Sequence, residues 1–268
     1  MIKYSFYLFI LVGPLTAAKN WESHSANLLP KQRLEIGLFQ PLRYGVSEKL
    51  EISSHPLVFF VMPNISVKTP HGNIGGWSTA SRHRLLYPTP LLNMFSKGIK
   101  IGGNTASLIS PNFVIPIMLG VSNDLLLTKS TSLADITFRG GIDLGFVFGD
   151  LDERSLIDLP LLYHRLGVYY NTWGLDFGID IYRKLTEKFW VHTDIDLLLL
   201  PGFSGSYNVE HKLLLIWKKS EKIRFSTGYK FIYGEFPYGN EARVLPYFPL
   251  IESWIPMFEI EFSRSLKQ

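Results

Sequence analysis

A six-residue pattern recurs four times between stretches in which polar and apolar residues alternate. In each copy a Ser or Thr is followed by two polar residues and then by an apolar one. The copies lie at 45–50, 120–125, 184–189 and 218–223. This pattern suits a tight hairpin turn, because the hydroxyl group bonds the local backbone and the apolar residue begins the next strand. The chain is therefore predicted to be a long antiparallel meander.

The segments between these turns alternate strictly. Residues 173–182 place apolar side chains at odd positions and mostly Gly and Asp at even ones, and the same period of two is found at 136–148, 189–199, 223–233 and 258–262. Strands of about ten residues exceed the usual length in globular proteins and match what a tilted strand needs to cross a bilayer. Closure into a barrel would remove the sheet edges.

Aromatic residues gather near the ends of the predicted strands. Examples are Tyr170, Trp173, Trp190, Trp217 and Trp254. Amphipathic rings are favoured at the level of lipid head groups, so this distribution indicates the aromatic girdles of a transmembrane barrel. The alternative is a soluble sandwich or lipocalin-like core that these rings fill, since such folds share the period of two.

The first residues have the layout of a secretory signal peptide at 1–18. Lys3 precedes an apolar stretch at 4–12, and small residues at 16–18 form a cleavage site. The chain has no cysteine, which excludes a lipoprotein anchor, disulfides and thiolate chemistry. Neither a linker nor a charge block divides the remainder, so 19–268 is predicted to be one domain.

From about residue 35 to 262 the chain resembles bacterial outer-membrane β-barrel proteins as a class. The resemblance rests on the cysteine-free signal, the repeated polar turns and segments such as 44–52, which look like a periplasmic turn and the strand after it. It implies residence in the outer membrane, contact with the lipid bilayer and recognition of the C-terminal strand by the insertion machinery. The class commonly ends on an aromatic residue, whereas Phe262 is followed by six more residues. Phe258, Ile260 and Phe262 are the best candidates for the assembly signal.

The predicted fold is all-β: a single closed antiparallel up-and-down transmembrane β-barrel of about 12 strands, with a range of 10 to 14. Thirteen candidate strands can be delimited, at 33–43, 49–54, 57–68, 78–88, 111–120, 125–131, 134–148, 158–170, 173–183, 189–200, 207–217, 223–235 and 254–264. Because bacterial barrels have even numbers, either 21–29 adds a strand or two pieces form one bent strand, for which 49–68 is the preferred place. Residues 89–110 and 236–253 are expected to form outer loops. The connection at 149–158 is then a long one on the side where a short one is expected.

Charged residues on the polar faces are predicted to line the lumen. They are Arg139, Asp143, Asp176, Asp180, Asp194, Asp196, Glu210, Lys212, Arg224, Lys230, Glu259 and Glu261. They could pair with one another in a filled or narrow lumen, or tune a water-filled pore for small polar solutes. The filled or narrow lumen is favoured, because Tyr182, Trp190 and Leu198 would occupy space in a barrel of this size.

Two groupings have the residue types of a hydrolase. Ser81 and His83 share a strand face, and His192 shares one with Asp194 and Asp196. A spacing of two on a strand arises often by chance, so neither grouping is specific. His211 would face lipid by strict alternation unless a bulge rotates it inward.

No metal-binding, cofactor-binding or nucleic-acid-binding pattern is recognisable. The favoured function is that of an integral, non-enzymatic outer-membrane barrel that acts as a narrow porin-like channel or as a structural surface protein. One alternative is an outer-membrane hydrolase acting on lipid or surface peptide. Another is a secreted soluble β-barrel that binds an apolar ligand.

Overall fold

A computed structural model describes residues 23–101, 104–156, 162–246 and 258–266. The predicted signal peptide at 1–18 lies outside these residues. Within them, neither α-helix is long and apolar enough to cross a membrane.

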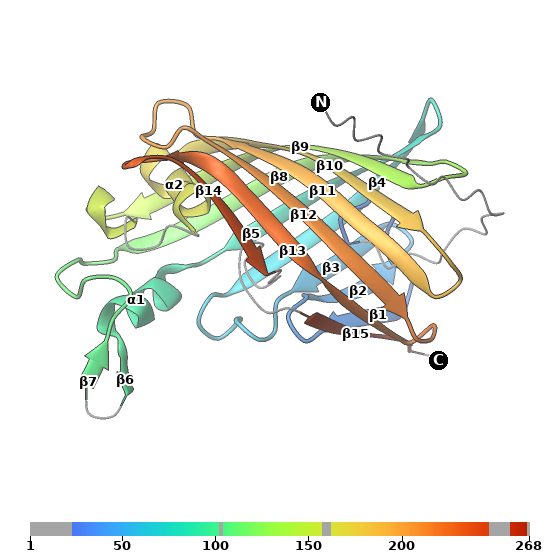
Figure 1. Cartoon of the computed structure of the whole chain (residues 1–268), viewed down its shortest axis with the longest axis horizontal. Helices are drawn as coiled ribbons and strands as arrows, with labels where there is room; N and C mark the ends of the chain where they lie inside the picture. Colours follow the sequence, from blue (N-terminus) through green and yellow to red (C-terminus); the bar gives the residue numbers. More distant parts are fainter. Residues whose placement is uncertain (1–22, 102–103, 157–161, 247–257, 267–268) are drawn as a thin grey trace, which may run out of the picture.

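Most of the described chain is in strands, with two short helices at one end of the molecule (Figure 1). The strands are β1 (Arg33–Gly37), β2 (Leu42–Ser47), β3 (Leu50–Ser54), β4 (Asn64–Ile74), β5 (Trp77–Leu86), β6 (Ile99–Ile101), β7 (Asn104–Ala106), β8 (Ile117–Ser130), β9 (Asp135–Phe148), β10 (Trp173–Lys184), β11 (Phe189–Leu199), β12 (Tyr207–Lys218), β13 (Ile223–Phe236), β14 (Gly239–Pro246) and β15 (Phe258–Ser265). The helices are α1 (Thr89–Lys97), the 3-10 helix Glu153–Leu156 and α2 (Tyr163–Asn171).

The large sheet closes on itself. Strands β1 to β5 and β8 to β13 follow one another as antiparallel neighbours, and β15 joins β13 to β1. Strand β14 pairs with Tyr229–Phe236 of β13 while β15 pairs with Ile223–Thr227, so these two strands share one position in the wall. The result is the predicted closed antiparallel barrel of twelve strands.

The wall of the barrel is uneven. Strands β8, β9 and β13 have 14 residues each, whereas β1 and β3 have only 5. Hairpin turns and the C-terminal end of β15 lie at one end, called the turn side. Both α-helices lie at the other end, called the helix side (Figure 1).

Alternation along the strands separates an apolar outer surface from a polar interior. On β10, Phe177 and Ile179 are 46% and 41% exposed, whereas Asp176 and Asp180 are 6% and 5% exposed. Because the exposed rows are apolar on neighbouring strands as well, the outer surface suits hydrocarbon.

The turn predicted at 120–125 is wrong: these residues continue through β8. Gly120 leaves room for the Tyr169 hydroxyl, and Asp124 accepts a hydrogen bond from Arg82 at 2.7 Å. The small Gly120 and the polar Asp124 therefore contribute close packing and ion pairing inside the barrel. The candidate strands at 111–120 and 125–131 merge into one.

The strand predicted at 158–170 is also wrong over its described part, because Tyr163–Asn171 forms α2. Leu162, Leu166 and Tyr169 follow helical spacing and are buried against Met118 and Leu200. Because 120–125 is not a turn and Tyr163–Asn171 is a helix, the connection between β9 and β10 lies on the helix side, where long connections are expected.

The count of twelve is right, but the chain is divided differently. The stretch 49–68 is two separate antiparallel strands, β3 and β4, not one bent strand. The predicted strand at 33–43 is split between β1 and β2, and residues 23–29 are not in a strand.

Candidate functional site

Eleven of the twelve charged residues predicted to line the lumen are buried within the barrel. They are Arg139, Asp176, Asp180, Asp194, Asp196, Glu210, Lys212, Arg224, Lys230, Glu259 and Glu261. The side chain of Asp143 is 25% exposed. In a low-dielectric interior, charges must find partners, so their contacts define the site.

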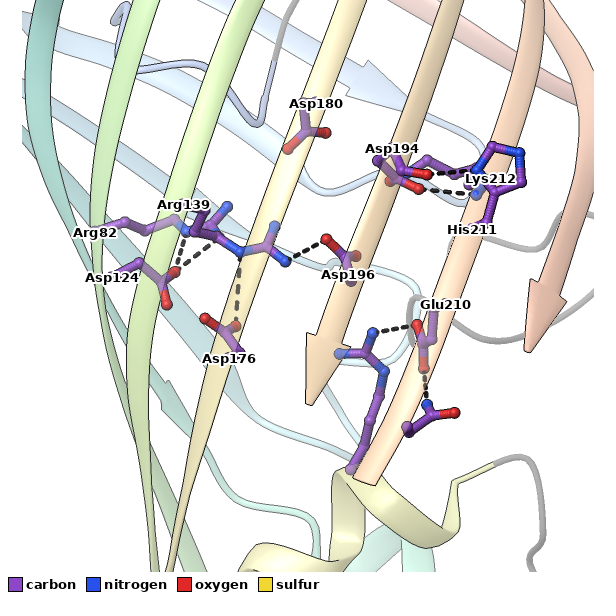
Figure 2. A network of polar contacts seen from close by, with 12 residues as sticks. Arg82, Asp124, Arg139, Asp176, Asp180, Asp194, Asp196, Glu210, His211 and Lys212 are labelled. Carbon is purple, nitrogen blue, oxygen red and sulfur yellow. Dashed lines mark hydrogen bonds and ion pairs between the residues drawn. The ribbon is translucent and has the colours of Figure 1, made fainter. Parts of the chain in front are cut away.

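One ion-paired cluster lies on the inner face of the wall, on the neighbouring strands from β5 to β11 (Figure 2). Arg82 Nε donates to Asp124 Oδ2 at 2.7 Å. Arg139 Nη2 donates to Asp196 Oδ1 at 2.7 Å, and Arg139 Nε lies 3.6 Å from Asp176 Oδ2. Arg82 and Asp124 lie on the adjacent strands β5 and β8, Arg139 and Asp176 lie on the adjacent strands β9 and β10, and Asp196 lies one strand further, on β11. The cluster therefore follows the inner face of the wall over these strands.

A second cluster occupies the side of the short strands. Arg43 Nη1 donates to Glu35 at 3.0 Å, and Arg43 Nε donates to Glu51 at 2.9 Å. Lys68 Nζ lies 3.6 Å from Glu51. We call both clusters together the ion-pair layer: Arg82, Asp124, Arg139, Asp176, Asp196, Glu35, Arg43, Glu51 and Lys68.

Apolar residues fill the lumen toward the turn side. Tyr182, Trp190, Leu214 and Ile216 form a buried cluster. The rings of Tyr182 and Trp190 are stacked, with their centroids 5.2 Å apart. The lumen is thus occupied by rings and aliphatic chains on one side of the ion-pair layer.

Glu210 connects α2 to the wall. Its carboxylate accepts hydrogen bonds from Arg165 at 2.6 Å and from Asn208 at 2.8 Å, and Lys230 Nζ lies 2.5 Å away. Glu210 is 2% exposed. Because Arg165 belongs to α2, this buried contact holds the helix in the lumen.

Near the seam of the barrel, Glu259 and Glu261 have different partners. Glu259 accepts backbone hydrogen bonds from Leu38 at 2.7 Å and Phe39 at 3.0 Å, whereas Glu261 pairs with Arg224. These contacts fix β15 against the start of the chain.

A cavity of about 310 Å³, which we call the chamber, extends from the two helices into the barrel as far as the ion-pair layer and His24. Aliphatic residues from both helices and from the strand ends line much of it, among them Leu86, Leu91, Leu166, Val168 and Leu198. Its volume is at the lower limit of typical small-molecule sites, which are mostly apolar with a few polar groups.

The charged residues that line the chamber are mainly cationic. The cations are Arg43, Lys68, Arg82, Arg84, Arg165, Lys212 and Lys230, and the carboxylates are Glu51, Asp143 and Asp196. Carboxylates that pair with these cations, such as Asp124 and Glu210, do not line it, and their side chains are 0% and 2% exposed. The polar side of the chamber therefore presents more positive than negative groups.

Helix α2 brings neutral polar groups to this end of the barrel. Burial raises the pKa of Tyr163 and of Tyr170 to about 12. Burial lowers the pKa of His164, whose Nε2 donates to the Glu235 carbonyl at 2.7 Å. These side chains are uncharged near neutral pH.

Asp180, His192 and Asp194 could hold a metal ion, because one ligand atom from each lies within 4.8 Å of the others. His192 Nε2 donates to Asp180 Oδ1 at 2.9 Å. His24, from the segment before β1, lies beside His192 with ring centroids 5.6 Å apart. The sequence patterns singled out neither this pairing nor His24.

The hydrolase groupings are not assembled as predicted. Ser81 is hydrogen-bonded to Thr69 and His71, both at 2.9 Å, whereas His83 donates to Asn123 at 2.7 Å. Among the described residues, no carboxylate orients His71. His192 pairs with Asp180 of the neighbouring strand, and Asp194 and Asp196 bind Lys212 and Arg139.

His211 faces outward without a bulge, since β12 keeps a continuous register with both neighbours. Its Nδ1 donates to the Asp194 carbonyl at 2.6 Å, and the Tyr229 hydroxyl lies 3.3 Å from Nε2. A polar ring is thus accommodated on the outer surface by local partners, not by rotation inward.

No known protein-family profile and no curated protein matches the chain. Among solved structures, it is similar to in-vitro folded OmpT, an outer membrane protein of Vibrio cholerae, with 8% identity and a TM-score of 0.40 over 85% of this chain and 62% of that one. The loop L8 deletion mutant of OmpT gives 10% identity and a TM-score of 0.39 over 87% and 62%. The chain therefore spans less than two thirds of these relatives.

The predicted fold is confirmed by the strand pairing, because the chain is a closed antiparallel barrel of twelve strands. Identities of this size carry no information about activity.

Proposed function

We propose that this chain is an integral protein of the bacterial outer membrane that binds an amphipathic ligand in the chamber and does not form an ion-conducting pore. The ligand carries an anionic head group and an apolar chain. The observation that carries the proposal is the chamber itself, which has aliphatic walls and a mainly cationic polar side above the ion-pair layer.

The head group is assigned from the charges that line the chamber. Arg82 and Arg84 line the chamber, whereas Asp124, the carboxylate that pairs with both of them, does not. A carboxylate or phosphate can accept charge-assisted hydrogen bonds from such guanidinium groups. A cationic head group would instead meet positive charge.

The apolar chain is assigned from the opposite walls. Leu91 of α1, Leu166 of α2 and Leu198 of β11 line the chamber. Covering these side chains with an aliphatic chain removes apolar surface from water, which favours binding.

The absence of conduction follows from the contents of the lumen. Arg43 and Arg139 each bind two carboxylates inside it, and Trp190 and Tyr182 fill it toward the turn side. A current of ions would require these buried contacts to separate. Passage of small polar solutes is therefore the less favoured version of the function.

Export and assembly complete the proposal. The segment 1–18 is proposed to direct export, and β15, with Phe258 and Phe262 on its outer face, is proposed to be the strand that the insertion machinery recognises. Both residues are about half exposed, at 54% and 49%. Deletion of 266–268, which leaves the whole of β15 in place, should leave assembly intact if β15 carries the signal.

The binding test uses full-length mature protein folded in detergent micelles. Hexadecanoate and hexadecyl phosphate should bind saturably, and the neutral hexadecanol should bind at least about tenfold more weakly. The two anionic probes distinguish a carboxylate from a phosphate head group. Equal binding of all three probes would contradict the assigned head group.

Leu198→Trp is the matched test of location. Leu198 lines the chamber and is 7% exposed, so the larger ring should weaken binding of the anionic probes about tenfold or more. Leu215→Trp is the control, because Leu215 is 45% exposed on the outer surface. Heat-dependent gel migration reports folding of both variants. Unchanged affinity in folded Leu198→Trp protein would place the ligand elsewhere.

A further inference from the structure

The pair of Asp180 and His192 lies apart from the ion-pair layer. Asp180 projects from β10 without contact to the arginines of the layer that Figure 2 draws. Asp180 is 5% exposed and His192 is 9% exposed. A buried carboxylate paired only with an imidazole leaves part of its bonding capacity for another positive group.

Two buried atoms at this place have no hydrogen-bond partner among the described residues. They are Asp180 Oδ2 and His24 Nδ1. Native proteins rarely leave buried polar atoms without a partner, and each such case calls for an explanation. Both residues line one small cavity of about 30 Å³, together with His192.

The volume of this cavity limits what it can hold. A volume of about 30 Å³ accommodates a single water molecule or a metal ion. Ser23, Asp135 and Glu261 also line it, so the surroundings are polar. A cavity of this size whose lining includes two residues with buried, unpartnered polar atoms has the properties of an ion site.

Asp180 and His192 are close enough to bind one ion, and the ring of His24 lies beside that of His192. Two donor atoms bound to the same Zn²⁺ are about 3.3 Å apart, given bonds of roughly 2.0–2.1 Å. His192 Nε2 and Asp180 Oδ1 are 2.9 Å apart, so a small shift suffices. Two imidazoles on such an ion place their ring centroids about 5 Å apart, and those of His24 and His192 are 5.6 Å apart.

We infer that His24, Asp180 and His192 bind one divalent transition-metal ion of the Zn²⁺ type, which fastens the segment before β1 to the barrel wall. Two imidazoles and one carboxylate are a ligand set that Zn²⁺ accepts. On binding, the ion takes the place of the proton on Nε2 of neutral His192, and that proton moves to Nδ1 of the same ring. Asp194 is also near, but it is bound by Lys212, so the remaining position falls to water.

The experiment uses the complete mature chain, folded in micelles and treated with a chelator that is then removed. Zn²⁺ is added, and binding is followed by calorimetry and by metal analysis after gel filtration. We expect one ion per chain. Co²⁺ in place of Zn²⁺ should give the visible absorption of a tetrahedral site, a reading that does not depend on any variant.

Asp180→Asn and His192→Gln keep the side-chain size and should each weaken Zn²⁺ binding by at least about tenfold. His24→Gln tests the contribution of the segment before β1 and should have a similar effect. His83→Gln is the matched control, because His83 is exposed on the outer surface and bonded to Asn123.

Two results would overturn the inference. One is the absence of saturable Zn²⁺ binding by folded wild-type protein. The other is binding that His83→Gln weakens as much as His192→Gln does, which would indicate adventitious coordination by surface imidazoles. Neither result bears on the ligand chamber, which the fatty-acid probes test independently.

Discussion

The two halves of the lumen differ in whether their inward side chains contact one another. Toward the turn side, buried charges and rings contact one another, as Arg43 does with Glu35 and Glu51 and as Tyr182 does with Trp190. Toward the helix side, α2 enters the lumen but leaves a chamber of about 310 Å³. A single barrel can therefore be closed in one half and hold a ligand in the other.

The difference arises from what the inward positions carry. Inward charged residues of the first half find partners on neighbouring strands, as Arg43 of β2 does with Glu35 of β1 and Glu51 of β3. At the helix-side ends of the strands, inward residues such as Leu86, Leu198 and Leu200 are aliphatic and cannot fill the full width. The lumen is thus narrower where ion pairs and rings gather and wider toward the helices.

The largest expected effect comes from breaking the ion-pair layer. Arg43→Met removes the partner of two buried carboxylates, Glu35 and Glu51, and should lower the free energy of unfolding by about 3–5 kcal/mol. Urea unfolding of the folded protein in micelles or vesicles measures this.

The control for that variant is Arg154→Gln. Arg154 pairs with Asp152, but its side chain is 73% exposed, so loss of the pair should leave stability unchanged. Equal effects of the two substitutions would show that burial does not distinguish the ion-pair layer from surface pairs.

The next effect tests whether the apolar outer surface of the barrel lies in lipid. Ile179→Arg places a charge on an exposed apolar row of β10 and should cost about 2–4 kcal/mol if the site is near the bilayer midplane. Unfolding from lipid vesicles measures the cost. Leu133→Arg in the exposed turn between β8 and β9 should be neutral, and a neutral Ile179→Arg would argue against a membrane-facing surface.

A smaller effect belongs to the chamber. Arg84→Gln should weaken binding of hexadecanoate by about tenfold, because a charge-assisted hydrogen bond contributes roughly 1.5–3 kcal/mol. Hexadecanol, which has no charge, should bind as in the wild type. Calorimetry with both probes separates the two cases. Equal losses for both would indicate that Arg84 shapes the chamber without contacting the head group.

The smallest effect is a pH dependence centred on α2. Burial holds the pKa of His164 below its ordinary value of 6.5, so the unfolded chain binds the proton more readily than the folded one. The stability that depends on neutral His164 is present above about pH 6.5 and is lost as the pH falls toward the lower folded pKa.

His164→Gln tests this dependence, since Gln can still donate to the Glu235 carbonyl but does not titrate. The difference in unfolding free energy between about pH 8 and about pH 5 should be smaller in the variant than in the wild type. His83→Gln, on the outer surface, should leave the difference unchanged. An identical difference in all three proteins would exclude His164 as a source of acid sensitivity.

The sequence predicted the barrel because alternation with a period of two is a local property. Residues 173–183 and 189–200 were delimited almost as β10 and β11 are observed. Segments whose structure depends on distant partners were not predicted. Gly120 resembles a turn residue, but it is needed where Tyr169 approaches β8, and nothing near Gly120 in the sequence indicates that approach.

The site was predictable to a similar extent. Alternation identifies inward charges such as Asp176 and Asp196, but Glu35, Arg43 and Glu51 lie on strands of 5 or 6 residues, too short for a clear period. His24 and the chamber depend on how a non-strand segment and a helix enter the lumen. A sequence pattern can indicate which face a residue occupies, but not which residue it will meet across the barrel.

A single-channel conductance measurement tests most directly whether the lumen is closed. Folded wild-type protein inserted in a planar bilayer should show no steady current at moderate voltages, because the ion-pair layer and the Tyr182–Trp190 stack occupy the passage. A stable ohmic current from a homogeneous, folded sample would contradict the sealed half of the barrel, and with it the distinction between seal and chamber.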